Sequence, residues 1–359
     1  MTEFEIIDSI RRRAARRNPE DLILGIGDDA AILSERSGRE MLLSVDLLVE
    51  EIDFKLAYAV PSWLGHKSLA VSLSDIAAMG GEPRFSLITL GIPRGDRISP
   101  SFLEEFFKGY FALAEEHGVT LLGGDLSSTP DRLMIDSFAI GYSPAGEALR
   151  RNGARAGDSI YVTGRLGAAA AGLQLLLQGV RPNEPNEPNE PDEPDEIDED
   201  EADEDEVEEN TRSLEQSALR AHLRPEPRVA FGRRLAAAGL AHAMIDVSDG
   251  LAQDLAHLCR ESGTGALIDY DSLPIAAEVS LIAQDRDAAL SLALNGGEDF
   301  ELLFTAAPAA AERLSETAGS CGLELSRIGE IIEGCGDVLL RSKGDLKPVS
   351  IRGYDHFRV

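Results

Sequence analysis

Residues 66–83 read HKSLAVSLSDIAAMGGEP, and the rest of the pattern is arranged around this stretch. Pro61 opens a helical segment that continues to the Gly80-Gly81 pair, because proline suits the first turn of a helix and glycine suits its end. Asp75 lies inside this helical segment, and an apolar run that reads as a strand follows it. The stretch therefore predicts a helix that carries a carboxylate and leads into a strand.

The elements predicted on either side of this helix divide the chain into two halves. The first half combines helices at 61–79 and 101–117 with strands at 22–24, 41–49, 85–92, 119–122 and 133–142, and a capping box at Thr2–Glu5 predicts a further helix. The second half alternates helices at 164–179, 228–239 and 250–261 with strands at 159–163, 243–246, 266–268 and 302–304. We therefore expect an α/β (α+β) protein with an N-terminal mixed-sheet domain, residues 1–148, and a C-terminal α/β domain, residues 149–359.

The composition excludes several classes of protein. With 34 Lys and Arg against 64 Asp and Glu, the formal charge of the 359 residues is −30, which opposes general binding to nucleic acid. No apolar run reaches the roughly 18 to 20 residues of a membrane helix, and the first residues lack the features of a signal peptide. Three separated cysteines exclude a disulfide scaffold. We therefore expect a cytoplasmic protein with neither nucleic acid nor membrane as partner.

The negative charge is concentrated in one segment. Residues 181–210 contain 17 acidic residues and one arginine, a net charge of −16, in a Pro-Asn-Glu and Pro-Asp-Glu repeat followed by an acidic tract. Such a segment has few apolar side chains to offset the entropy of ordering. We expect a disordered acidic insert at 181–215 within the C-terminal domain, and metal buffering or partner binding is the alternative role.

Aspartates recur next to small residues at the ends of predicted elements. The six sites are Gly27-Asp28-Asp29, Ser44-Val45-Asp46, Ser74-Asp75, Gly124-Asp125, Asp246-Val247-Ser248-Asp249-Gly250 and Gly296-Gly297-Glu298-Asp299. Carboxylates are hard oxygen ligands that suit Mg²⁺ shared with nucleotide phosphates, although each site alone is also typical of a helix cap or a turn. If the sites converge in space, they indicate metal-dependent phosphate chemistry. The motifs of P-loop proteins, dinucleotide sites and serine hydrolases are absent from the sequence.

These motifs, taken in order, resemble those of the thiamine-monophosphate kinase family. The similar blocks are GIGDDAAIL at 25–33, HKSLAVSLSDIAAMGGEP at 66–83, GGD at 123–125, NGARAGDSIYVTGRLGAAAAGL at 152–173, IDVSDGL at 245–251, GGEDFEL at 296–302 and GYDHF at 353–357. The resemblance covers most of the chain outside the acidic insert. It implies the two-domain fold of the aminoimidazole ribonucleotide synthetase superfamily and a homodimer that pairs through its N-terminal sheets.

The resemblance also implies ATP-dependent phosphorylation of thiamine monophosphate to thiamine diphosphate, with several Mg²⁺ ions and room for a monovalent cation. The positions that match the family's metal ligands are Asp28, Asp29, Ser44, Asp46, Asp75, Asp125, Asp246 and Asp249. Those that match its ATP contacts are Gly124, Asp125, Arg151 and Ser248, and those at its substrate site are Asp53, Glu298 and Tyr354. No separate catalytic residue is expected, because a phosphate oxygen of the substrate is already ionised and can act as the nucleophile in an in-line transfer.

Three departures from the family pattern lie near the nucleotide and the substrate. Asp53 stands where a histidine is usual, Ser44-Val45-Asp46 replaces Thr-Thr-Asp, and no arginine follows Gly124-Asp125 directly. The acidic residues that match the metal ligands are all present, so the departures bear on the identity of the substrate more than on metal and ATP binding. The alternatives are another ATP-dependent enzyme of the same superfamily with a different acceptor, such as a purine-synthesis relative, or a non-catalytic acidic metal-binding protein.

Overall fold

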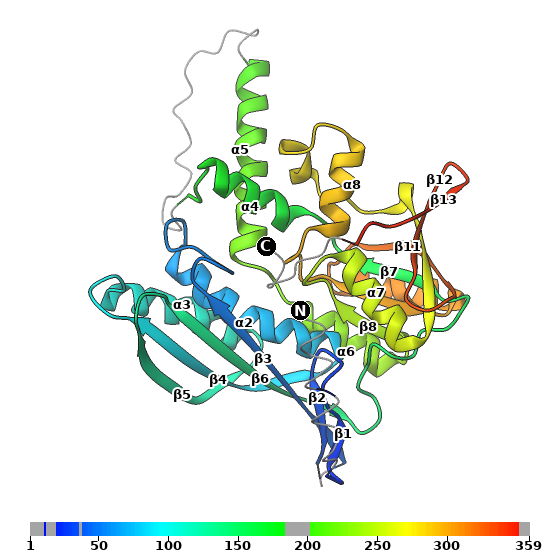
Figure 1. Cartoon of the computed structure of the whole chain (residues 1–359), viewed down its shortest axis with the longest axis horizontal. Coiled ribbons are helices and arrows are strands. Elements are labelled where there is room, and N and C mark those ends of the chain that lie inside the picture. The colour runs from blue at the N-terminus through cyan, green and yellow to red at the C-terminus, as the bar shows by residue number, and fades with distance from the viewer. Residues whose placement is uncertain (1–10, 12–18, 36–37, 184–201, 352–359) are drawn as a thin grey trace.

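A computed structural model of the chain describes residues 11, 19–35, 38–183 and 202–351. For residues 202–207 it describes the backbone alone. The capping box at Thr2–Glu5 and the predicted substrate residue Tyr354 lie outside the described residues. Two sheets with helices packed on them make up the fold (Figure 1). Within the described ranges, no helix is both long and apolar enough to cross a membrane.

The N-terminal sheet has six strands in the order β1-β2-β3-β6-β4-β5. Their bounds are β1 Leu22–Leu24, β2 Ala31–Ser34, β3 Arg39–Val49, β4 Glu82–Pro93, β5 Thr120–Thr129 and β6 Met134–Pro144. All neighbours are antiparallel except β4 and β5, which run parallel and are connected through helix α3, Pro100–Glu116. A helical crossover of this kind is the usual way to join parallel strands.

Helix α2, Pro61–Ala78, covers one face of this sheet against β3 and β6. Fourteen of its 18 residues are buried, because α3 and helix α6, Val229–Ala238, also pack on it. The approach to α3 is so close that a Cβ at Gly65 would meet the Phe106 carbonyl oxygen at 1.8 Å. The helix predicted from the 66–83 stretch is therefore the central element of the molecule.

The other face of the N-terminal sheet is exposed and apolar. Val45 on β3 lies opposite Phe138 on β6, which lies opposite Leu87 on β4. Val45 and Leu47 of β3 are exposed apolar side chains on this face, whereas Leu126 of β5 is aligned with Leu90 and Ile135 on the side that faces α2. We call the outward side of β3, β4, β5 and β6 the outer sheet face.

The C-terminal sheet has seven strands in the order β13-β12-β9-β11-β7-β10-β8. Their bounds are β7 Ser159–Thr163, β8 Ala243–Asp246, β9 Thr264–Asp269, β10 Leu302–Ala306, β11 Leu325–Glu333, β12 Val338–Ser342 and β13 Asp345–Pro348. The helices of this half are α4 Ala168–Gln178, α5 Ala202–Leu223, α6, α7 Leu251–Ser262, α8 Arg286–Asn295 and α9 Ala311–Ser320. One apolar core joins the two halves, since Leu73 and Ile76 of α2 share it with Leu235 and Phe304 of the second half.

The structure contains elements that the sequence did not predict, namely β2, α8, α9, β11, β12 and β13, and it departs from the expectations for β5 and for the acidic insert. The strand expected to end at Gly123-Gly124-Asp125 continues to Thr129, because an irregularity in the pairing of β4 and β5 next to Gly123 lets the ladder resume. A Cβ at Gly124 would lie 1.7 Å from the Ile88 carbonyl oxygen, so only glycine allows this pairing.

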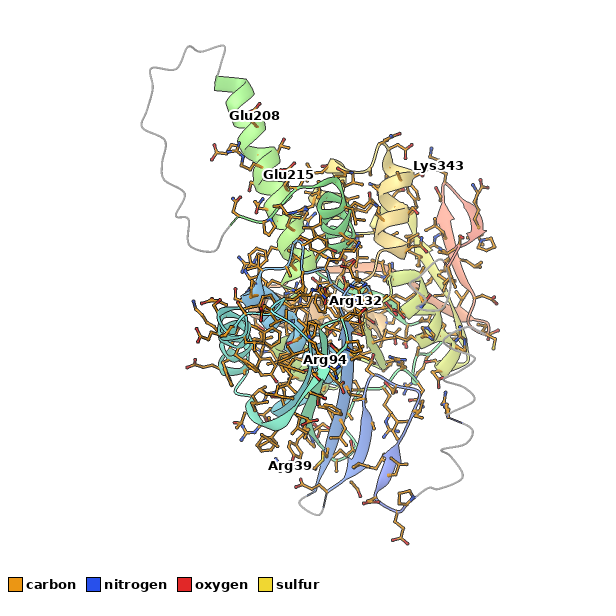
Figure 2. All side chains as sticks on the ribbon, turned by 60° about the vertical axis from the view of Figure 1, so that its left-hand side comes forward. Arg39, Arg94, Arg132, Glu208, Glu215 and Lys343 are labelled. Carbon is orange, nitrogen blue, oxygen red and sulfur yellow. The ribbon has the colours of Figure 1, made fainter. Side chains whose placement is uncertain are left out.

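The expectation of disorder across 181–215 is wrong for its last part. Helix α5 begins at Ala202 and runs to Leu223, and Glu208 lies on the half of it that projects from the body of the protein (Figure 2). The helix is anchored at its other end, where Ala218, Leu219 and Leu223 pack on Leu175 and Leu176 of α4. Residues 184–201 of the insert lie outside the described residues.

Candidate active site

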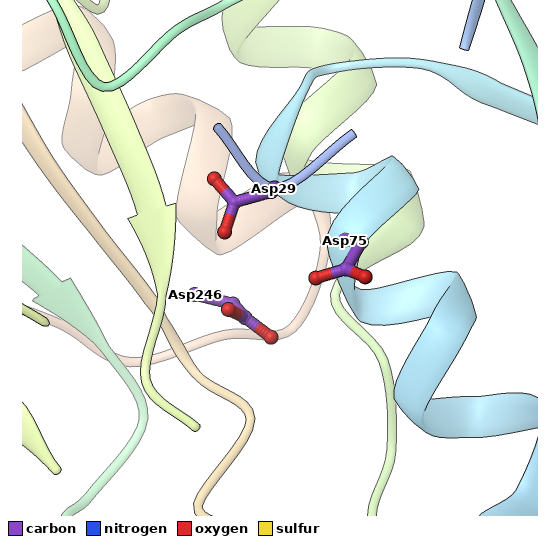
Figure 3. Close-up of side chains that lie close together, drawn as sticks. All are labelled: Asp29, Asp75 and Asp246. Carbon is purple, nitrogen blue, oxygen red and sulfur yellow. The ribbon is translucent and has the colours of Figure 1, made fainter. Parts of the chain in front are cut away.

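Three carboxylates from distant parts of the sequence meet beside α2. One oxygen from each of Asp29, Asp75 and Asp246 lies within 4.8 Å of the other two, and Figure 3 shows the three side chains turned toward one another. Asp29 belongs to the loop between β1 and β2, Asp75 to α2, and Asp246 ends β8. We call these three residues the aspartate cluster. Its members come from both halves of the chain, so only the shared core brings them together.

The cluster concentrates negative charge in a buried place. Burial, followed by the charges of Asp46, Asp246 and Asp29, raises the pKa of Asp75 well above its ordinary value. Burial and the charge of Asp29 raise the pKa of Asp246 to about 8, despite a hydrogen bond from Ser74. Like charges and low solvation both disfavour ionised carboxylates. A bound cation would reverse this effect, so hard oxygen ligands in this state fit Mg²⁺.

Serine hydroxyls fix the orientation of these carboxylates. Ser74 Oγ donates to Asp246 Oδ2 at 2.5 Å, and Ser72 Oγ lies 2.8 Å from Asp46 Oδ2. Ser44, a predicted ligand, donates to Asp75. Because Ser74 lies on α2 and Asp246 on β8, its hydrogen bond crosses between the two halves of the protein.

Three further predicted residues lie at the edge of the cluster. Asp46 faces α2 through Ser72, and burial raises its pKa to about 6. Arg151 Nη2 is 2.7 Å from Asp29 Oδ1, and the Arg151 backbone N–H donates to Asp28 at 3.1 Å. Burial and the charge of Asp29 raise the pKa of Asp28 to about 7. Arg151, predicted to contact ATP, is therefore held at the aspartate cluster by ion pairing.

The loop after β8 places two more predicted residues. The backbone oxygen of Ser248 accepts a hydrogen bond from the backbone N–H of Glu298 at 2.8 Å, so this loop lies beside the segment that carries Glu298. Asp249 accepts a hydrogen bond from Gln253 Nε2 at 3.0 Å. Asp254 is buried, and one of its oxygens accepts hydrogen bonds from the backbone N–H groups of Asp249 and Gly250. Asp254 thereby shapes the loop that presents Asp249.

Gly124 and Asp125 lie on β5, apart from the cluster. Strand register aligns Gly124 with Ile88, Ser137 and Asp46, on the side of the sheet that faces α2. Asp125 is aligned with Thr89, Asp136 and Leu47, on the outer sheet face, and it is exposed. Neighbouring residues of a strand point to opposite faces, so Asp125 does not join the aspartate cluster within this chain.

Two of the predicted substrate residues are described. Glu298 Oε1 is 2.7 Å from Lys67 Nζ, and Glu298 Oε2 is 2.9 Å from His222 Nδ1. Asp53 lies in the turn after β3, where its Oδ2 accepts a hydrogen bond from the Val49 backbone N–H at 2.8 Å. Asp53 is thus held by its own turn, whereas Glu298 is held by side chains from α2 and α5.

Comparisons with known proteins show the family of the chain. The family model described as "AIR synthase related protein, N-terminal domain" matches residues 27–143, and its C-terminal counterpart matches 155–341. The thiamine-monophosphate kinase of Bacillus subtilis (strain 168) is 34% identical, with 100% of each chain covered. That of Salmonella typhimurium is 36% identical, with 99% of this chain and 98% of the relative covered. The chain belongs to the thiamine-monophosphate kinase family.

Solved structures of the family have the same fold. The structure described as "AaThiL complexed with AMPPCP and TMP" is 30% identical, has a TM-score of 0.78 and covers 99% of this chain and 97% of its own. Thiamine-monophosphate kinase from Stenotrophomonas maltophilia K279a is 38% identical and has a TM-score of 0.72. The match covers 96% of this chain and 98% of that structure's chain. These likenesses confirm the fold class, and the chain is an enzyme of a kinase family, as the resemblance implied.

Several residues of the site were missed by reasoning from the sequence. They are Lys67, Ser72, His222 and Asp254, and Ser74 was named only as the neighbour of Asp75, without a role of its own. The serines belong to the quoted 66–83 stretch, and Asp254 follows Gly250 at the start of a helix, so a pattern was available for these three. His222 offered no signal, because it follows the acidic insert and its partner Glu298 is far away in sequence.

Proposed function

We propose that this protein transfers the γ-phosphoryl group of ATP to thiamine monophosphate, forming thiamine diphosphate and ADP. The single observation that carries the proposal is the aspartate cluster, in which the carboxylates of buried Asp29 and Asp246 and half-buried Asp75 lie within 4.8 Å of one another, in a family of kinases. Support for the two substrates comes from the family member solved with AMPPCP and TMP. The direct in-line transfer is part of the proposal.

The residues present fit Mg²⁺. Asp29, Asp75 and Asp246 would hold it, with Asp28, Ser44, Asp46 and Asp249 available for further ions. Bound there, Mg²⁺ would neutralise charge that develops on the transferred phosphoryl group. The number of ions and any monovalent cation stay predictions.

The chain's own side chains would bind and orient the substrates. Arg151 supplies the guanidinium nearest the cluster, within reach of a phosphate oxygen, and Ser248 and Gly124 stay in the proposal as ATP contacts. Glu298 supplies a carboxylate for the organic part of thiamine monophosphate, and Asp53 and Tyr354 remain predicted contacts there. No side chain has to remove a proton, because the second pKa of a phosphate monoester is about 6. Asp125 stays a predicted ligand, although it lies on the outer sheet face.

We infer that the outer sheet face pairs with a second copy of the chain. Val45 and Leu47 are 54% and 55% exposed on this face, and Val45 belongs to the apolar row that runs through Phe138 to Leu87. Exposed apolar side chains that gather on one face are typical of an interface. A dimer is the commonest symmetric assembly. Val45→Lys should shift the protein to monomer in sedimentation velocity. Leu346→Lys, on the exposed strand β13 of the other sheet, is the matched control and should sediment like the wild type.

The test of the function is turnover of ATP by purified protein with Mg²⁺ and one of three acceptors. These are thiamine monophosphate, free thiamine and an aminoimidazole-pathway substrate. We expect thiamine diphosphate from the monophosphate alone, and no product once the metal is removed by a chelator. Mg²⁺-dependent ATP binding without this product would contradict the proposed acceptor while leaving the metal site intact.

A further inference from the structure

Glu298 is held at both of its carboxylate oxygens by side chains from two different helices. Lys67 Nζ, from α2, is 2.7 Å from Oε1, and His222 Nδ1, from α5, is 2.9 Å from Oε2. Lys67 Nζ also donates to the backbone oxygen of His222 at 3.1 Å. The three residues therefore form one connected unit, which we call the Glu298 triad.

Only one member of the Glu298 triad can be reached from solvent. The side chains of Lys67 and His222 are 2% and 4% exposed, whereas that of Glu298 is 29% exposed. A ligand at this place can therefore touch the carboxylate but neither of its partners. An ionised carboxylate offers about four lone-pair positions, and the two contacts leave others for an N–H donor or a cation of the ligand.

The charges within the triad keep Glu298 ionised. Burial opposes its charged form, but the charge of Lys67 and the contacts of His222 outweigh it and lower the Glu298 pKa to about 2. Burial, together with the charge of Lys67, lowers the pKa of His222. His222 is then neutral near pH 7, and because an ionised carboxylate only accepts, the His222 proton lies on Nδ1. Two further groups feel the charge of Glu298: burial and this charge raise the pKa of Tyr58, which is neutral in this range, and burial, with Glu298 among the smaller causes, raises the pKa of Asp299 to about 7.

The backbone of Glu298 is also constrained. Its φ of 68° lies in the left-handed region, which is uncommon for a residue with a side chain. The backbone N–H of Glu298 bonds to Ser248, next to Asp249. The carboxylate is thus fixed from its side chain and its backbone, at a position tied to the loop after β8.

We propose that Lys67 and His222 are positioning residues that orient the Glu298 carboxylate toward a cationic or N–H-donating heterocycle in the acceptor substrate. This proposal rests on the proposed function. The substrate would meet a carboxylate whose direction and charge were set before binding, which reduces the free energy spent on ordering it. The two residues would act on acceptor binding and leave the ATP and metal contacts unchanged.

The experiment compares four variants with the wild type in steady-state kinetics. Lys67→Met removes the ammonium and keeps the length of the side chain. His222→Leu removes the N–H donor, and His222→Asn retains one near the position of Nδ1. The matched control is His66→Gln, because His66 is equally buried on α2 and its Nε2 contacts the Pro225 backbone oxygen rather than Glu298. Thermal unfolding of each variant checks the fold.

We expect Lys67→Met and His222→Leu each to raise the KM for thiamine monophosphate about tenfold. The KM for ATP should stay within about twofold in both variants. His222→Asn should recover most of the loss, and His66→Gln should behave like the wild type. If Lys67→Met does not fold, the comparison of His222→Leu with His222→Asn carries the test.

Three outcomes would contradict the proposal, and they are distinguishable. A wild type that forms no thiamine diphosphate contradicts the proposed function and, with it, the role of the triad. A wild type that is active while its folded variants keep an unchanged KM for thiamine monophosphate contradicts only the positioning role. Equal increases in the KM of both substrates would indicate a structural role and would also overturn it.

Discussion

Helix α2 contributes to two acidic sites in which the negative charge is compensated to different extents. At the Glu298 triad, Lys67 of this helix compensates the carboxylate and helps lower its pKa to about 2. Two turns further along, Asp75 meets Asp29 and Asp246, and burial with mutual repulsion raises the pKa of Asp75 and Asp246. Arg151 is the basic partner that contacts Asp29. The first site is neutralised within the protein, whereas the second carries an excess of negative charge.

The difference indicates what each site is suited to bind. A buried carboxylate that is already paired can present a fixed hydrogen-bond acceptor, and it needs no ion to stay charged. A group of carboxylates that outnumbers its basic partners is unstable in its fully ionised form until a cation is bound. The aspartate cluster therefore fits a metal ion with phosphate, and the Glu298 triad fits an organic group. The predictions below test this division, beginning with the largest expected effect.

Removing one charge from the aspartate cluster should abolish most activity without harming the fold. Asp75→Asn and Asp246→Asn should each lower kcat about a thousandfold, about 4 kcal/mol of transition-state stabilisation. The metal-free melting temperature should be unchanged or higher, because each change relieves repulsion between buried carboxylates. Asp96→Asn, at an exposed loop position, is the control. Wild-type turnover in either cluster variant would contradict the assignment.

The serine that bridges the two halves should matter for metal affinity. Ser74→Ala removes the hydrogen bond to Asp246, and we expect Mg²⁺ to bind about tenfold more weakly. Ser68 is an equally buried serine of the same helix, but its hydroxyl bonds to the Gly65 backbone oxygen. Isothermal titration with Mg²⁺ should therefore distinguish Ser74→Ala from Ser68→Ala. Equal affinities would show that Ser74 does not position the ligand.

The two sites should give opposite dependences of stability on pH in metal-free protein. The folded pKa of Asp246, about 8, is above its ordinary 3.8, so its contribution to stability is lost as pH rises from about 4 to about 8. The folded pKa of Glu298, about 2, is below its ordinary 4.5, so its contribution is present above about pH 4.5 and is lost as pH falls toward 2.

Melting temperatures of chelator-treated protein measure both slopes. We expect a fall of a few degrees between about pH 5 and about pH 8, reduced by Mg²⁺ and by Asp246→Asn. Glu298→Gln should flatten only the acid side of the profile. A rise in melting temperature toward pH 8 without metal would contradict the uncompensated charge of the cluster.

The smallest effect is expected at the acidic insert. Deleting residues 184–210 should change kcat less than about twofold and stability by about 0.5 kcal/mol or less. The side chains of Glu208 and Glu209 are exposed, and the buried part of α5 begins at Ala218. By contrast, Leu219→Asp should destabilise the fold, because Leu219 of α5 is fully buried against α4. A deletion that collapses activity would show that the insert has a structural or regulatory part.

Local patterns were sufficient to predict much of the fold and part of the site. Proline at the start and paired glycines at the end located α2 within the quoted stretch. Aspartates beside small residues pointed to Asp29, Asp75 and Asp246 as candidates. The end of β5 and the whole of α5 were missed, because β5 depends on pairing with β4 and α5 on packing against α4. Neither partner is visible within a local window of sequence.

The sequence by itself therefore determined which residue types were available, where most helices and strands begin, and which family the motifs resemble. Only the tertiary structure decided that Asp29, Asp75 and Asp246 converge, whereas Asp125 lies on the opposite side of a sheet. It also brought Lys67 to His222, 155 residues away, and both to Glu298. The physical reason is that burial and charge compensation depend on distances in space, and the shared apolar core of the two halves sets those distances.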